Sequence, residues 1–227
     1  MTPPSSARPT APVIIAIDGP AASGKGTLAG RLAAHFDYPH LETGRLYRAV
    51  GVKLLEAGIP EPTEAQAADA AQHLGDTDLE NPNLYAETSG LMASKVSAMG
   101  PVRAALLQFQ RDFAARPPGN KAGAVIDGRD IGTVVCPAAQ HKFFVTASPE
   151  IRAERRFAQL QTRGAGAIYA AVLRDIQERD AMDTQRTNAP LRQAPDAHLL
   201  DTSDMTADQA FAAALSIISS STASSSR

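Results

Sequence analysis

The chain has little of what several classes of protein depend on. Its 227 residues include one cysteine, Cys136, no tryptophan, and only 5% aromatic residues. One cysteine excludes an intrachain disulfide and a multi-cysteine metal site, which is typical of a reducing compartment. No apolar run approaches the roughly 18 residues that a membrane span requires. The N-terminus also lacks the apolar stretch of a signal peptide, so we expect a soluble cytoplasmic protein with no membrane partner.

Net charge is small as well. The chain has 22 basic and 24 acidic residues, a formal charge of −2, and 44% apolar residues, which is ordinary globular composition. There is no global basic field, so we expect no nucleic-acid partner. However, 17 of the basic residues are arginine, and nine of these lie between Arg129 and Arg192. Arginine grips phosphate in bidentate fashion, which favours a phosphorylated ligand, although surface solubility would explain a mixture just as well.

Short apolar segments alternate with helical patterns along the chain. Continuous, largely β-branched runs predict buried strands at residues 13–17, 124–126, 142–145 and 198–200. Apolar spacing predicts helices at residues 27–36, 43–57, 61–74, 91–99, 102–113, 149–161, 167–184 and 206–217. The alternation predicts an α/β fold with a mostly parallel central sheet. The helical segment 43–113 would lie beside the carboxyl ends of the strands. Such sheets bind their ligands at that edge.

A glycine-rich segment follows the first expected strand and opens the first helix. It reads Gly19-Pro20-Ala21-Ala22-Ser23-Gly24-Lys25-Gly26-Thr27 and matches G-x-x-x-x-G-K in the required context. Backbone N–H groups of such a loop cradle phosphate oxygens, and Lys25 would reach the β- and γ-phosphates. Because Gly26 follows the lysine, Thr27 would be the hydroxyl that holds Mg²⁺. The motif predicts a nucleoside triphosphate site and leaves its use open.

Further charged groups cluster near the same edge. Asp127-Gly128-Arg129-Asp130 ends a buried strand, where such charges cost desolvation unless they bind a ligand or form a structural ion-pair network. Arg48 lies near the start of the helix that Thr43 is expected to cap, and is either a phosphate clamp or a solvated arginine.

Two arginine-lined helices follow, with a glycine-rich link at residues 164–166 between them. The first carries Arg152, Arg155 and Arg156 at helical spacing, and the second carries Arg179, Asp183 and Arg186. They predict a mobile lid that closes on transferring phosphates. Solvated faces laced with arginine–carboxylate pairs are the alternative.

Taken in order, these segments resemble the bacterial cytidylate kinases, a family of P-loop nucleoside-monophosphate kinases. The resemblance covers residues 13–217. It is carried by Ile17-Asp18-Gly19-Pro20 with Gly24-Lys25-Gly26-Thr27, Thr43-Gly44-x-x-Tyr47-Arg48, the run from Asp127 to Val135, and Glu178-Arg179-Asp180 with Asp183 and Arg186. It implies a three-layer fold with a helical acceptor-binding region and a short lid. It also implies an enzyme of pyrimidine metabolism that phosphorylates CMP and dCMP with ATP and Mg²⁺, and we expect a monomer.

The resemblance also implies roles for individual residues. ATP would be bound by residues 19–27 and the lid arginines Arg152, Arg155 and Arg156. The acceptor phosphate would contact Arg48, Arg129 and Arg186, the sugar Arg179 and Asp183, and the cytosine Ser94, Arg103 and Asp130, with Thr43 in place of the usual serine. Lys25, Arg129, Arg179 and Arg186 would be catalytic. An aspartate can accept from the amine of cytosine, whereas the carbonyl of uracil would oppose two acceptors.

The expected organisation is one kinase domain over residues 13–218 between disordered tails at 1–12 and 219–227. Its core would comprise residues 13–42 and 116–218, its acceptor-binding region 43–115, and its lid about 152–186. Residues 75–89 are too few to hold in full the β-rich insert that bacterial members usually carry.

Two rival functions stay open at this point. A kinase of the same fold could act on a different nucleotide or on a hydroxyl, such as that of a sugar or shikimate. A hydroxyl acceptor would need a base, for which Asp18 or Asp127 could serve. An ATP-gated binding protein would bind ATP and turn over very slowly. A nucleoside-monophosphate acceptor needs no base because its phosphate oxygen is already anionic, so transfer would be direct and in line.

Overall fold

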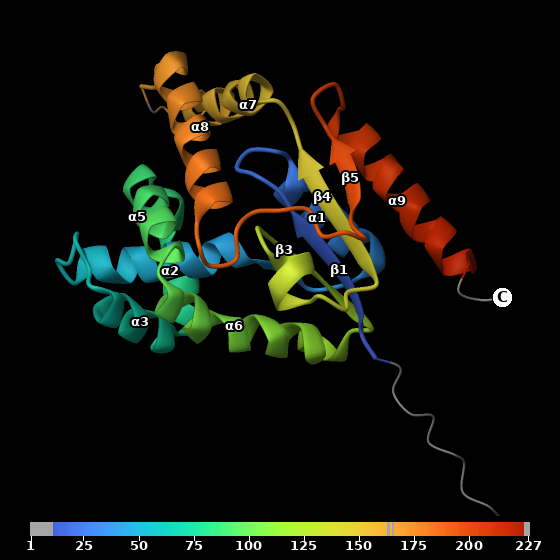
Figure 1. The fold of residues 1–227 in the computed structure, drawn as a ribbon, viewed down its shortest axis with the longest axis horizontal. Coiled ribbons are helices and arrows are strands. Elements are labelled where there is room, and N and C mark those ends of the chain that lie inside the picture. Colours follow the sequence, from blue (N-terminus) through green and yellow to red (C-terminus); the bar gives the residue numbers. More distant parts are fainter. Residues whose placement is uncertain (1–10, 163, 165, 225–227) are drawn as a thin grey trace, which may run out of the picture.

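A sheet of five parallel strands forms the centre of the molecule (Figure 1). The computed structural model describes residues 11–162, 164 and 166–224. The strand order is β2-β3-β1-β4-β5, with β1 (Val13–Asp18) in the middle. The others are β2 (His40–Glu42), β3 (Gly123–Gly128), β4 (His141–Thr146) and β5 (His198–Asp201). The four expected strands are confirmed, and β1 lies between two neighbours whose carboxyl ends can contribute to one site.

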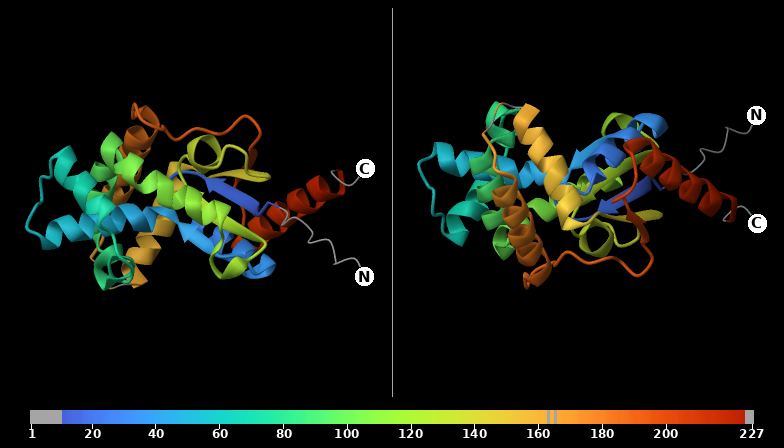
Figure 2. Two further views of the ribbon diagram at one scale, coloured as in Figure 1. Left: turned by 90° about the horizontal axis from the view of Figure 1, so that it is seen from below. Right: turned by 90° about the horizontal axis from the view of Figure 1, so that it is seen from above.

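Alternation along β1 builds a core on each face of the sheet. Ile15 and Ile17 pack with α1 (Lys25–Phe36) and α9 (Ala207–Ser224). Ile14 and Ala16 pack on the other side, where α6 (Gly100–Ala115) and the π-helical turn η3 (Ile131–Val135) supply the partners. The two views in Figure 2 show helices on both sides of the sheet. The expected three-layer α/β architecture is therefore confirmed.

The segment between β2 and β3 is helical and has an apolar core of its own. It contains α2 (Thr43–Glu56), α3 (Glu64–Gln72), α4 (Asp76–Leu79), η1 (Pro82–Tyr85), α5 (Glu87–Ser97) and α6, followed by the short turn η2 (Pro118–Asn120). Leu46 and Val50 of α2 pack with Met92 and Val96 of α5 and with Leu106 of α6. Residues 75–89 hold α4 and η1 and no strand, as their length led us to expect.

Two further helices extend from the carboxyl ends of the strands. α7 (Pro149–Thr162) begins just after β4, and α8 (Tyr169–Gln185) packs against it. In Figure 1 this pair stands above the sheet, and α8 descends between α5 and the strands. The pair occupies the place of the expected lid.

Three local features differ from what the sequence predicted. β2 was not predicted, because three residues without a β-branched side chain give no strand pattern. Thr43 is the first residue of α2 rather than its cap, and its hydroxyl donates to the carbonyl of Asp127 at 2.8 Å. α9 continues to Ser224, into the tail expected to be disordered from residue 219. Ile218 is buried in the core, which accounts for the helix as far as this residue.

Residues 1–10 and 225–227 of the expected tails lie outside the described residues. None of the helices in the described part of the chain has the length and apolar character needed to cross a bilayer.

Candidate active site

The phosphate loop joins the end of β1 to the start of α1. Its backbone conformation depends on two glycines: Gly19 has φ 155° and Gly24 has φ 88°. A Cβ at Gly19 would collide with the carbonyl oxygen of Val145 in β4, so only glycine fits this close approach. The loop is tied to the end of β5 by the Thr202 hydroxyl, which donates to the Ser23 carbonyl at 3.0 Å. Lys25 follows as the first residue of α1.

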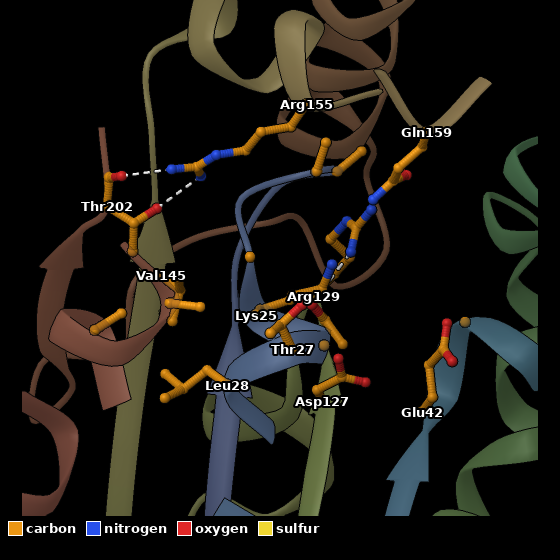
Figure 3. A pocket seen from close by; sticks show the side chains of 18 of the residues that line it. Lys25, Thr27, Leu28, Glu42, Asp127, Arg129, Val145, Arg155, Gln159 and Thr202 are labelled. Carbon is orange, nitrogen blue, oxygen red and sulfur yellow. Dashed lines mark hydrogen bonds between the residues drawn. The ribbon is translucent and has the colours of Figure 1, made fainter. Parts of the chain in front are cut away.

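A cavity of about 630 Å³ lies against this loop, and we refer to it as the donor cavity. Lys25 and Arg129 point into the same space, and Asp127 lies between Thr27 and Glu42 (Figure 3). The opposite end of the cavity is apolar; its lining includes Leu28, Val145, Met205 and Ala210. One end of the cavity therefore suits phosphates, and the other suits a flat, largely apolar group such as a nucleobase.

The cationic end of the donor cavity carries more positive charge than its acids balance. Burial, and then the nearby Arg129, lowers the pKa of Lys25 to about 7. The same two causes lower the pKa of Arg179 to about 10. Within the described residues Arg179 has no hydrogen bond or ion pair. An anionic ligand would relieve this repulsion, because opposite charge favours the protonated forms of both groups.

Oxygen donors suited to Mg²⁺ lie at the same end. Asp127 is 2% exposed, and its Oδ1 atom has no hydrogen-bond partner among the described residues. The Thr27 hydroxyl lines the same cavity. The described residues hold no cluster of three metal-ligating side chains. This arrangement suits Mg²⁺, which binds few protein oxygen atoms and takes its other ligands from phosphates and water.

A second cavity of about 70 Å³, the acceptor pocket, shares its wall with the donor cavity. All nine residues that sequence reasoning assigned to the acceptor line it: Thr43, Arg48, Ser94, Arg103, Arg129, Asp130, Arg179, Asp183 and Arg186. They come from α2, α5, α6, the end of β3, and α8 with the residue after it. The fold thus gathers in one place residues spread over more than half of the chain.

Ion pairs link the side chains of the acceptor pocket to one another. The Arg103 guanidinium donates to Asp130 at 2.5 Å, and Arg129 Nε donates to Asp183 at 2.6 Å. Arg186 lies 3.7 Å from Asp183 and 4.0 Å from Asp130. Burial opposes ionisation of Asp183, but Arg129 outweighs it and lowers the pKa of that carboxyl. The Arg186 Nη2 atom is buried without a hydrogen-bond partner among the described residues. A ligand with both donors and acceptors could exchange into this network.

Comparison with known proteins agrees with this geometry. The family model described as cytidylate kinase matches residues 15–220. The chain belongs to the cytidylate kinase family. A cytidylate kinase from Paramagnetospirillum magneticum is 61% identical over 207 residues, which cover 91% of this chain and 98% of that protein. One from Rhodopseudomonas palustris is 54% identical over 206 residues, 91% of this chain and 95% of that protein.

A likeness to a solved structure concerns the fold alone. An uncharacterized protein from Eubacterium ventriosum has a TM-score of 0.52 and 15% identity, over 92% of this chain and 99% of that one. Together with the family match, this agrees with the three-layer P-loop architecture seen in the sheet.

The three lid arginines of this family member separate in space. Arg155 lines the donor cavity and donates to the Thr202 hydroxyl at 3.0 Å and its carbonyl at 2.6 Å. Arg156 lines a third cavity of about 80 Å³, between α5, α7 and α8, together with Arg48 and Arg179.

Arg152 does not lie at the donor cavity, where the expected contact with ATP would place it. It is 3% exposed and does not line the donor cavity. Its guanidinium donates to both carboxylate oxygens of Asp180, at 2.9 and 2.5 Å, and to the carbonyl of Ala21 at 3.3 Å. Its Nε donates to the Ala147 carbonyl at 2.8 Å. Arg152 therefore braces the phosphate loop against α8.

Some lining residues were absent from the expected set. Tyr47 lines the acceptor pocket, and its ring centroid lies 5.7 Å from the Arg103 guanidinium carbon. It stands in the quoted Thr43-to-Arg48 motif, which was the signal for it. Glu42, Gln159 and Thr202 line the donor cavity. Glu42 would have been found if β2 had been recognised, because it ends that strand; we see no sequence signal for the other two.

Proposed function

We propose that this protein transfers the γ-phosphoryl group of ATP to CMP or dCMP, giving ADP and CDP or dCDP. The observation that carries the proposal is the shared wall between the donor cavity and an acceptor pocket lined by Ser94, Arg103 and Asp130. Membership of the cytidylate kinase family, with 61% identity to a named member, supports the same reaction.

Cytosine is the base that the acceptor pocket suits best. Asp130 is an acceptor for the exocyclic amine of cytosine, and Arg103 is a donor for its O2 and N3 atoms. The ion pair between these two residues holds both side chains on the same wall of the pocket. Uracil presents a carbonyl where cytosine has its amine, which would place two acceptors face to face.

Phosphoryl transfer here is a matter of position and charge. Lys25, Arg129 and Arg179 line the donor cavity and the last two also line the acceptor pocket, so they can reach phosphates in both. Arg48 and Arg186 add positive charge on the acceptor side. The attacking oxygen of CMP is already anionic, so in-line attack on the γ-phosphorus needs no general base. Bond formation to the CMP oxygen accompanies cleavage of the bond to the β,γ-bridging oxygen, which leaves with ADP.

Mg²⁺ would be held by Thr27 and, directly or through water, by Asp127. When bound, it neutralises charge on the β- and γ-phosphate oxygens during transfer. Oδ1 of Asp127 has no hydrogen-bond partner among the described residues, and His40 Nε2 lies 3.7 Å from it, which supports this assignment.

The geometry argues against Asp18 as a base for a hydroxyl acceptor. Both of its carboxylate oxygens accept backbone N–H groups, from Ile131 and Gly132, and it lines neither the donor cavity nor the acceptor pocket. We further propose that the protein is a cytoplasmic monomer, as we expected from the sequence.

The test is ADP formation from ATP and Mg²⁺ with CMP, dCMP, UMP, AMP, GMP and shikimate offered separately, beside a control without acceptor. Fast turnover restricted to CMP and dCMP is the expected result. Rapid turnover with shikimate alone would show a hydroxyl kinase. ATP binding without turnover on any acceptor would overturn the proposal in favour of an ATP-gated binding protein.

A further inference from the structure

Asp18 is a buried carboxylate that the proposed reaction does not use. It is the last residue of β1 and is 4% exposed. Burial is the main cause that raises its pKa to about 6, against the lowering effect of the Gly132 and Ile131 amides. A carboxylate placed there costs desolvation free energy, so its contacts should reveal what it contributes.

Those contacts join two segments that are far apart in the sequence. Oδ1 of Asp18 accepts the N–H of Ile131 at 2.7 Å, and Oδ2 accepts the N–H of Gly132 at 2.8 Å. Gly19, the first residue of the phosphate loop, follows Asp18 directly. Asp130 and Arg129, which line the acceptor pocket, directly precede Ile131. One side chain thus connects the first residue of the donor loop to the segment expected to recognise the acceptor.

The connected segment has an irregular conformation that needs an outside partner. Asp130 has φ −145° and ψ 26°, and η3 begins at the next residue without a side-chain cap from Asp130. The two N–H groups at the start of η3 are those that Asp18 accepts. There is also little room for adjustment: a Cβ on Gly132 would lie 3.3 Å from Asp18 Oδ2 and 3.2 Å from Lys142 Cδ.

We propose that Asp18 is a positioning residue: through the amides of Ile131 and Gly132 it fixes Asp130 and Arg129 against the phosphate loop and so sets the preference for cytosine. This inference rests on the proposed function. Asp18 touches neither nucleotide and acts only through the segment that it holds.

The test compares wild-type protein with Asp18→Asn and Gly132→Ala. Asparagine keeps the size of the side chain but turns an N–H₂ group toward one of the two amide N–H groups, so two donors oppose each other. Gly132→Ala crowds the same contact from the other side. Ile218→Ala in α9 is the control, because it removes a buried apolar side chain that itself lines neither cavity.

We expect both variants to stay folded, to raise KM for CMP at least fivefold, and to lower the CMP-to-UMP ratio of kcat/KM at least fivefold. KM for ATP should change less than threefold, and Ile218→Ala should lower Tm without changing the ratio. Hydrogen exchange at the amides of Ile131 and Gly132 should be faster in Asp18→Asn than in the wild type.

A folded Asp18→Asn with an unchanged ratio and unchanged KM for CMP would overturn the inference. Failure of both variants to fold would also overturn it, since Asp18 would then serve only stability. Wild-type protein that does not phosphorylate CMP would instead reject the proposed function, which is a separate and distinguishable outcome.

Discussion

The donor cavity and the acceptor pocket are built in opposite ways. The donor cavity encloses about 630 Å³ and is shaped at its phosphate end by the backbone of residues 19–24. The acceptor pocket encloses about 70 Å³, and its walls are charged side chains joined by ion pairs. Backbone N–H groups can be held in place before a ligand arrives, because the conformation of a glycine-rich loop aims them inward and each carries only a partial charge. Buried charges cannot be left alone, so here they pair with one another until a substrate exchanges into the network.

The two halves also depend on different cores. The phosphate loop grows from the central strand of the sheet, which is packed on both faces. Most of the acceptor side stands on α2, α5 and α6, whose apolar contacts form a separate core. Arg129 belongs to both halves, because it lines both cavities from the end of β3, as Arg48 and Arg179 do from α2 and α8.

Removing Arg129 should therefore have the largest effect. We expect Arg129→Ala to lower kcat by about 100- to 1,000-fold, because a charge aimed at the transferring phosphates is lost. The fold should persist, with unchanged far-UV circular dichroism. Arg116→Ala, at an exposed arginine outside both cavities, is the matched control and should keep wild-type kcat. Near-normal turnover in Arg129→Ala would remove Arg129 from the catalytic set.

Changing Asp130 should alter selectivity more than rate. We expect Asp130→Asn to lower the CMP-to-UMP ratio of kcat/KM by about 10- to 100-fold, since a good base-reading pair contributes about 1–3 kcal/mol. The ratio is measured with both acceptors at fixed ATP and Mg²⁺. Asp112→Asn, a surface carboxylate on α6, should leave it unchanged. An unaltered ratio in Asp130→Asn would contradict the role of Asp130 in reading the base.

Replacement of Arg152 should change stability, whereas replacement of Arg155 should change the KM for ATP. Arg152→Ala leaves Asp180 and the Ala21 carbonyl without their donor, so we expect the free energy of unfolding to fall by about 3 kcal/mol. Arg155→Ala should have little effect on stability and raise KM for ATP about five- to tenfold, because it removes a charge from the donor cavity. Urea unfolding and ATP titrations distinguish them, and equal effects of both variants on both quantities would contradict the placement of Arg152.

The smallest expected effect is the uptake of a proton by Lys25 when ATP binds. With its pKa lowered to about 7, Lys25 is mostly neutral at pH 8 in the free site and charged at pH 6. Bound phosphates raise that pKa, so ATP binding should take up a fraction of a proton at pH 8 and almost none at pH 6. Calorimetry in two buffers of different ionisation enthalpy measures the uptake, and Lys25→Met should abolish it. Heats independent of the buffer at pH 8 would show that Lys25 keeps its ordinary pKa.

The sequence predicts the donor side and the acceptor side unequally, because one is built from a continuous segment and the other from separate ones. The phosphate loop was predicted residue by residue, because all of its chemistry lies in nine consecutive positions. The acceptor pocket could be assembled only through the resemblance to a family, since Thr43 and Arg186 share no local pattern and meet only through the fold. The spacing of residues along a helix also cannot show which part of the molecule each of its side chains will contact.

Arg152 illustrates that limit. It lies on the same side of α7 as Arg155 and Arg156. However, successive residues of a helix are rotated by about 100°, so the three side chains point in different directions around the helix axis. Arg152 contacts the phosphate loop, Arg155 the end of β5, and Arg156 the third cavity beside α5. The turn η3 was missed for a related reason, because its first N–H groups donate to Asp18, a residue more than one hundred positions away.

The separate core of the helical region has a consequence for the history of such enzymes. Every side chain of that core comes from one uninterrupted stretch, residues 46–106, which leaves the sheet after β2 and returns at β3. Such a stretch can be exchanged by a single genetic replacement, provided that the end of α6, where Ala114 packs on the sheet, is kept. One ancestral triphosphate-binding scaffold could thus acquire new substrates by accepting a different cassette at this one position.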